Sequence, residues 1–189
     1  YKKLNNTNIE LFTVFAEILN LKNENFNNLT FCKTLFKKNK NFYDKNLVFI
    51  IGTKFYESGI LSLDDEIKSI SKVVKFWKKN NKELIYVAKR TTSNQKIRLI
   101  KKKLNISIIY NNLPLELAFI NYKKIPNSVC SFGSGLDIFL PKLFIKLNNY
   151  LIIDKDSSKY EMKKYFSLYE KYYKMFFKKY HGKNKIFKL

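Results

Sequence analysis

Residues 47–66 read LVFIIGTKFYESGILSLDDE and contain the pattern that decides the fold. The first six residues form a short apolar run that ends at Gly52, which is typical of a strand buried on both faces of a sheet. Ser62 then precedes acidic residues, which indicates a helix that begins there and runs to about Lys79. The stretch therefore predicts a strand, a loop and a helix in succession.

The same alternation continues along the chain. Further predicted strands are ELIYVA (83–88), ISIIY (106–110), SVCSF (128–132) and YLIID (150–154). Predicted helices cover 8–22, 30–38, 94–104, 114–122 and 136–140, and Pro141 is expected to bend or end the last of these. Strands that alternate with helices predict an α/β, Rossmann-like fold, with a mostly parallel sheet that carries helices on both faces.

Composition narrows the classes of function. The chain has 189 residues, of which 46% are hydrophobic, so it can build a core and is not a disordered basic tail. Cys32 and Cys130 are its two cysteines, which argues against a disulfide-framed secreted module. His181 is the single histidine, which excludes Ser-His-Asp and Cys-His catalysis and His-rich zinc sites, so no metal is expected. No apolar run approaches the roughly 20 residues of a transmembrane helix.

The net charge is +22, and nearly all of the excess is lysine. Arg90 and Arg98 are the two arginines, whereas proteins that read base edges rely on the planar fork of arginine. No specific nucleic-acid partner is therefore expected. Lys, Asn, Ile, Phe and Tyr share A/T-rich codons, so genome composition is one explanation of the bias. Selection for an anionic surface is the other.

The chain divides into three predicted segments. Residues 1–45 are helical and, since the first residue is Tyr1 and not Met, are expected to link to a missing N-terminal domain. Residues 46–156 form the Rossmann-like domain. Residues 157–189 place aromatic and lysine side chains at helical spacing, which predicts an amphipathic helix. This helix packs its aromatic stripe on the domain, lies through residues 157–181 on an anionic membrane, or does both if the stripe is only partly covered.

Ligands of parallel sheets bind at the carboxyl ends of the strands, which directs attention to the loops there. The loop SFGSGLD (131–137) places Ser131, Phe132, Gly133, Ser134 and Gly135 between a strand and a helix. The two glycines let backbone N–H groups approach a phosphate, and the two serines add hydroxyl donors. The simpler alternative is a glycine turn with a serine cap.

Four other charged residues lie on the same predicted edge. Lys89 and Arg90 directly follow a strand, and they are either an anion cradle or two solvated cations. Glu57 is a general base, a group that binds a sugar hydroxyl, or an exposed loop residue. Glu116 either accepts hydrogen bonds from ribose hydroxyls or is a first-turn helix acid.

Taken together, FIIGTKFYESGILSLDDEIKSI, ELIYVAKR, LPLELAF and IPNSVCSFGSGLDIFL resemble the C-terminal half of glycosyltransferase family 52 over roughly residues 46–155. The members of this family are bacterial sialyltransferases of lipooligosaccharide and capsule synthesis. The resemblance implies the C-terminal half of a GT-B fold that binds CMP-sialic acid. It also implies inverting, metal-independent transfer to a glycan or glycolipid acceptor, with no cofactor.

The resemblance also assigns roles to residues. It implies CMP contacts by Gly52, Arg90, Glu116, Ser131, Phe132, Gly133, Ser134 and Gly135. It makes Glu57 the base and Lys89 the group that stabilises the leaving phosphate, because Lys89 stands where the family carries histidine. Thr92 falls near the position of a family glutamate, and Ser134-Gly135 keeps one serine of a family serine pair.

The resemblance implies a cytoplasmic location, at the inner face of the bacterial inner membrane. Monomer and homodimer are both left as alternatives. The alternative function is a catalytically degenerate or non-enzymatic basic module that binds an anionic membrane or nucleic acid.

Overall fold

A computed structural model describes residues 42–110, 124–144, 146–154, 160–179 and 184–188, together with Thr30, Lys33 and Thr34, which are helical. The helices predicted over 8–22 and 114–122, and with them Glu116, lie outside the described residues. So do His181 and most of the helix predicted over 30–38.

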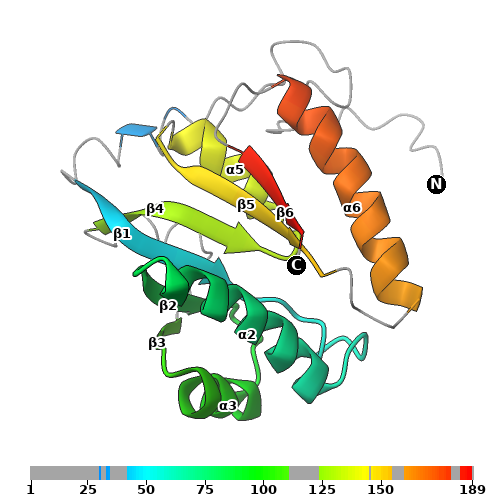
Figure 1. Ribbon diagram of the computed structural model, residues 1–189. Coiled ribbons are helices and arrows are strands. Elements are labelled where there is room, and N and C mark those ends of the chain that lie inside the picture. The colour runs from blue at the N-terminus through cyan, green and yellow to red at the C-terminus, as the bar shows by residue number, and fades with distance from the viewer. Residues whose placement is uncertain are drawn as a thin grey trace, which may run out of the picture.

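Six described strands form one sheet in which every neighbouring pair is parallel (Figure 1). They are β1 (Phe42–Ile51), β2 (Glu83–Ala88), β3 (Ser107–Tyr110), β4 (Lys124–Ser131), β5 (Asn148–Ile153) and β6 (Asn184–Lys188). The strand order is β3-β2-β1-β4-β5-β6. Strands β2 and β3 therefore lie on one side of β1 in chain order, and β4, β5 and β6 lie on its other side in chain order. This is a doubly wound, Rossmann-like arrangement, and the predicted fold class is confirmed.

The sequence located the strands well where both of their faces are apolar. Strand β2 spans the predicted residues, whereas β1 and β4 begin earlier than predicted. Their extra residues pair with each other, as in Phe42 with Lys124, and the register shifts between Asp44 and Val48. Polar side chains interrupt the apolar pattern in these extensions. Strand β6 was not predicted, because lysines flank its two apolar residues, Ile186 and Phe187.

In the described part of the chain, four connections between strands contain a helix: α2 (Leu63–Lys79), α3 (Asn94–Leu104), α5 (Leu136–Leu143) and α6 (Tyr160–Lys179). The two predicted caps are confirmed. The Ser62 hydroxyl accepts a hydrogen bond from the Asp65 N–H at 3.2 Å, and the Ser93 hydroxyl accepts one from the Lys96 N–H at 3.3 Å. Helix α3 ends at Asn105, whose φ of 47° is left-handed.

Helix α5 continues past Pro141 to Leu143, three residues beyond the predicted range 136–140, so this proline does not end the helix. Pro141 has no N–H to donate to the Asp137 carbonyl one turn earlier. The Asn149 side chain donates to that carbonyl instead, at 2.8 Å. A side chain from β5 thus replaces the missing helical hydrogen bond and ties α5 to the sheet.

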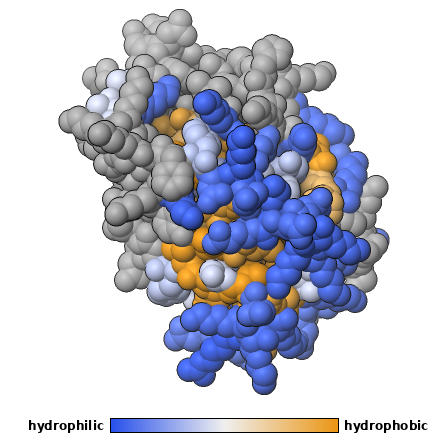
Figure 2. Space-filling view, turned by 60° about the vertical axis from the view of Figure 1, so that its left-hand side comes forward, coloured by the Kyte–Doolittle hydropathy of each residue, from blue (hydrophilic) through white to orange (hydrophobic). Residues whose placement is uncertain are grey.

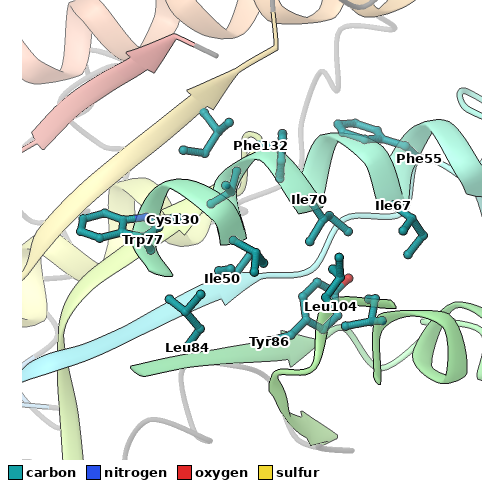
Figure 3. Close-up of a cluster of buried hydrophobic side chains, with 14 of the residues drawn as sticks. Ile50, Phe55, Ile67, Ile70, Trp77, Leu84, Tyr86, Leu104, Cys130 and Phe132 are labelled. Carbon is teal, nitrogen blue, oxygen red and sulfur yellow. The ribbon is translucent and has the colours of Figure 1, made fainter. Parts of the chain in front are cut away.

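Alternate residues of the central strands point into two hydrophobic clusters, one on each face of the sheet. Val48 and Ile50 of β1 pack with side chains of α2, α3 and α6. Figure 3 shows part of this cluster, with Ile67, Ile70 and Trp77 of α2 over Ile50, Leu84 and Tyr86. Leu47, Phe49 and Ile51 pack with α5 on the other face, behind the strands in Figure 1. The predicted burial of this strand on both faces is confirmed.

Candidate functional site

The strand order brings the predicted loops to one place. Strand β1 pairs with β2 on one side and with β4 on the other, with Ile51 opposite Val87 and Ile50 opposite Cys130. The loops that follow these three strands therefore meet at the carboxyl edge, where the winding reverses between β1 and β4. Ligands of doubly wound sheets bind at such a point.

A buried carboxylate, Asp137, organises the loop after β4. It lies in the first turn of α5 and is 1% exposed. Its Oδ2 accepts hydrogen bonds from the Ser131 hydroxyl and from the Ser134 N–H, the latter at 2.8 Å. Its Oδ1 has no hydrogen-bond partner. We call Lys89, Ser131, Ser134 and Asp137 the Asp137 cluster.

The charges of this cluster act on each other. Burial raises the pKa of Asp137 to about 7, although the bonds from Ser131 and Ser134 and the charge of Lys89 act to lower it. Burial lowers the pKa of the partly buried Lys89, and the charge of Asp137 opposes that shift. Asp137 therefore exchanges a proton near neutral pH, as general acids and bases do.

Two tyrosines of α6 cover the glycine loop. The Tyr165 hydroxyl donates a hydrogen bond to the Gly133 carbonyl at 3.3 Å. Gly133 has φ +95°, and a Cβ there would lie 2.9 Å from the Tyr165 hydroxyl and 3.0 Å from the Tyr169 ring. The two rings stack with centroids 5.1 Å apart. The open space beside Gly133 that was expected for a phosphate is thus occupied by α6.

Glu57 belongs to a second polar group, which we call the Lys96 cluster: Thr53, Glu57, Glu66 and Lys96. Lys96 is fully buried and donates to the Thr53 carbonyl at 2.8 Å, to Glu57 at 3.2 Å and to Glu66. Glu66 Oε1 also accepts from the Thr53 hydroxyl, and its Oε2 accepts from the Tyr56 N–H at 2.8 Å. The cluster ties the loop after β1 to α2 and α3.

The surroundings of Glu57 make it a poor base. Its Oε1 accepts from the Ser93 N–H at 2.9 Å at the start of α3, and its Oε2 faces Lys96. Burial acts to raise the pKa of Glu57, but these bonds and the charge of Lys96 outweigh burial, so the pKa lies below its ordinary value. A carboxylate held in this way accepts protons weakly.

The remaining predicted residues have different surroundings. Gly52 is buried, and a Cβ there would lie 2.7 Å from the Tyr86 hydroxyl, so this glycine makes room for a neighbouring strand. Phe132 is buried edge to face with Phe55, at 6.5 Å between ring centroids. Arg90 and Gly135 are exposed. Of the predicted residues, Lys89 joins Ser131 and Ser134 in one cluster, whereas Gly52 and Phe132 belong to the packing.

A small cavity lies beneath this edge. Its volume is about 10 Å³, which is the space of a single water molecule. Its polar lining comes from Thr53, Glu66 and Ser69. The cavity is far too small for a nucleotide. Among the described residues, no group of three or more His, Cys, Asp or Glu side chains is placed to hold a metal ion.

Sequence reasoning missed Asp137 and the two covering tyrosines as site residues. The spacing Ser134-x-x-Asp137 repeats that of Ser62-x-x-Asp65, which indicates a helix start and nothing more. Asp65 is exposed, whereas Asp137 is buried. The cause of the difference is tertiary structure, which a local pattern does not record.

Comparison of the chain with models of protein families found no match, and comparison with curated proteins found no match in sequence. The resemblance to glycosyltransferase family 52 therefore stays a prediction from the sequence. The Rossmann-like fold rests on the structure itself.

Proposed function

We propose that this chain is the donor-binding domain of a glycosyltransferase that resembles the family 52 sialyltransferases and uses CMP-sialic acid. The observation that supports it most is the Asp137 cluster, which combines a cation, two serines and a buried acid where the winding of the sheet reverses. Nucleotide phosphates bind at such points in doubly wound folds. The acceptor is a cell-surface glycan or glycolipid, and the protein works at the inner face of the bacterial membrane.

Lys89 has the clearest role in this proposal. A glycosyl transfer from CMP-sialic acid breaks the bond between the sugar and the phosphate, and the negative charge on the departing CMP grows. An ammonium fixed beside that phosphate stabilises the charge, more strongly where water is excluded. Lys89 is partly buried and directly follows β2, which suits it to this role. Glu57, whose oxygens are engaged by Ser93 and Lys96, is not assigned as the base.

A calorimetric titration tests the proposal. We expect CMP to bind in the micromolar range at near-physiological salt, and UMP and AMP to bind at least about tenfold more weakly. Arg90→Ala should weaken CMP binding, because Arg90 lies on the loop beside Lys89. Arg98→Ala is the matched control, since Arg98 is exposed on α3. A folded protein that binds none of the three nucleotides would rule the proposal out.

A second candidate function, binding to an anionic membrane, is favoured by the outer side of α6. Its exposed side chains include Lys163, Lys164, Lys171 and Lys174, and Leu168 is 53% exposed among them. Its inner side packs on the core through Met162 and Phe166. Figure 2 shows a different face, turned forward from the left-hand side of Figure 1, where hydrophilic side chains surround a hydrophobic area. None of the described helices is long and apolar enough to span a membrane.

Cosedimentation with vesicles tests the second candidate. We expect binding to vesicles that contain anionic lipid, and loss of binding as salt rises. Reversal of Lys163, Lys164 and Lys171 to Glu should abolish it. The matched control reverses Lys101, Lys102 and Lys103, which are exposed on α3. Equal losses in both triple variants, or equal binding to nucleic acid, would show attraction to any polyanion and would exclude a specific membrane face.

A further inference from the structure

One oxygen of Asp137 is left without a structural task. Both hydrogen bonds that the Asp137 carboxylate accepts from the loop after β4, from Ser131 and from Ser134, go to Oδ2. Oδ1 is buried and has no partner. A buried polar atom without a partner costs free energy, so native structures keep few of them.

A neighbouring carboxylate shows the contrast. Glu66 is also 1% exposed, and both of its oxygens are used: Oε1 by Thr53 and Lys96, Oε2 by the Tyr56 N–H. The protein thus satisfies one buried acid at this edge completely and leaves the other half satisfied. An unpartnered acceptor in a binding region is what a ligand donor would complete.

The surroundings of Oδ1 define the ligand. A carboxylate oxygen accepts a hydrogen bond from a hydroxyl or an amine, and Lys89, which directly follows β2 at the same edge of the sheet, attracts an anion. A second buried oxygen without a partner, Thr92 Oγ1, lies in the turn that Thr92 N–H closes on the Lys89 carbonyl at 2.8 Å. The acceptor Asp137 Oδ1 and the cation Lys89 together suit a phosphate ester that also carries hydroxyl groups.

We propose that Asp137 Oδ1 accepts a hydrogen bond from a ribose hydroxyl of a nucleotide whose phosphate lies at Lys89, an assignment that rests on the function proposed above. Asp137 then holds the loop with one oxygen and the ligand with the other. Because Tyr165 and Tyr169 cover Gly133, a ligand that approaches Oδ1 past the glycine loop must displace these two side chains. Helix α6 thereby becomes the cover of the site.

The test is a thermodynamic cycle with two ligands and two proteins. CMP and its 2′,3′-dideoxy analogue, which lacks the ribose hydroxyls, are titrated by calorimetry into the wild-type protein and into Asp137→Asn. The asparagine carbonyl still accepts from Ser131 and Ser134, but an NH₂ group replaces Oδ1. We expect the wild type to prefer CMP at least about tenfold, and the variant to lose that preference.

Each outcome decides between roles. A purely structural role for Asp137 would weaken both ligands equally in the variant, so an unchanged preference for CMP would overturn this inference and leave the proposed function standing. No binding of CMP to the folded wild type would overturn both. Asp65→Asn is the matched control, because Asp65 also lies in the first turn of a helix, three residues after a serine, and is exposed. It should change neither affinity.

Discussion

The Lys96 cluster and the Asp137 cluster lie at the same edge of the sheet and differ in how fully their carboxylate oxygens are hydrogen-bonded. In the Lys96 cluster, both oxygens of Glu66 and of Glu57 accept hydrogen bonds, and Lys96 donates to three acceptors. In the Asp137 cluster, one oxygen of a fully buried acid accepts nothing. A polar network in which every group is hydrogen-bonded joins elements of the fold. A network with an unused acceptor can still accept a hydrogen bond from a ligand.

The contrast also corrects the sequence prediction. The acid predicted to act as a base, Glu57, belongs to the complete network. The acid with a free oxygen, Asp137, is in the sequence only the last residue of a loop motif. Charge and loop position alone do not separate the two, because the difference lies in their hydrogen-bond partners.

The largest expected effect comes from breaking the complete network. Lys96→Ala leaves Glu66 buried without its cation, and we expect the free energy of unfolding to fall by about 3–5 kcal/mol, measured by urea denaturation. Lys103→Ala is the control, because the Lys103–Asp64 pair is 50% and 83% exposed and should be worth at most about 1 kcal/mol. If Lys96→Ala does not fold, the milder double variant Lys96→Met with Glu66→Gln should. Equal stabilities of Lys96→Ala and Lys103→Ala would contradict the comparison.

The next effect concerns the pH dependence of stability. The pKa of Asp137 is raised in the folded protein to about 7 from an ordinary 3.8, so the folded state holds a proton that the unfolded state has lost. Its stabilising contribution is present below about pH 4 and is lost as the pH rises to 7, at up to about 1.4 kcal/mol per pH unit. Urea denaturation from pH 4 to pH 8 should show this loss in the wild type and not in Asp137→Asn. Parallel curves for the two proteins would count against it.

A smaller effect is expected from adding a side chain at the contact between the glycine loop and α6. Gly133→Ala puts a Cβ against Tyr165 and Tyr169 at a positive φ, and we expect it to lower the free energy of unfolding by about 1–3 kcal/mol. Gly135→Ala, where a Cβ meets nothing within 4 Å, should change it by less than about 0.5 kcal/mol. Similar values for the two variants would show that α6 does not press on the loop.

The smallest effect tests a single hydrogen bond of the cover. Tyr165→Phe removes the donor to the Gly133 carbonyl and keeps the ring. We expect a loss of about 0.5–1.5 kcal/mol in the free energy of unfolding. The variant should also bind CMP faster in stopped-flow measurements, because the cover opens more easily. A slower association would mean that the hydroxyl assists entry of the ligand.

Local features were predicted from the sequence, and long-range ones were not. The bounds of β2, and the caps at Ser62 and Ser93, follow from apolar runs and from hydrogen bonds between near neighbours, which the sequence displays directly. Strand β6 depends on pairing with β5, and its own two apolar residues are too few to indicate it.

The site follows the same rule. Its location was predicted, because parallel strands end at a common edge. The burial of Asp137 and the closing of the glycine loop were not, because they depend on tertiary packing, including that of α6 about 30 residues farther along the chain.

The pairing of β1 with β4 has a consequence for how the protein folds. Val48 pairs with Ser128, whereas Leu47 pairs with Glu83, so the seam at the centre of the sheet joins residues much farther apart in the chain than its neighbour does. Contacts of such long range form slowly. The two halves of the sheet can each collapse before they meet, and the loops of the site come together only when they do. A molecule that binds residues on both sides of that seam would slow the separation of the two halves during unfolding.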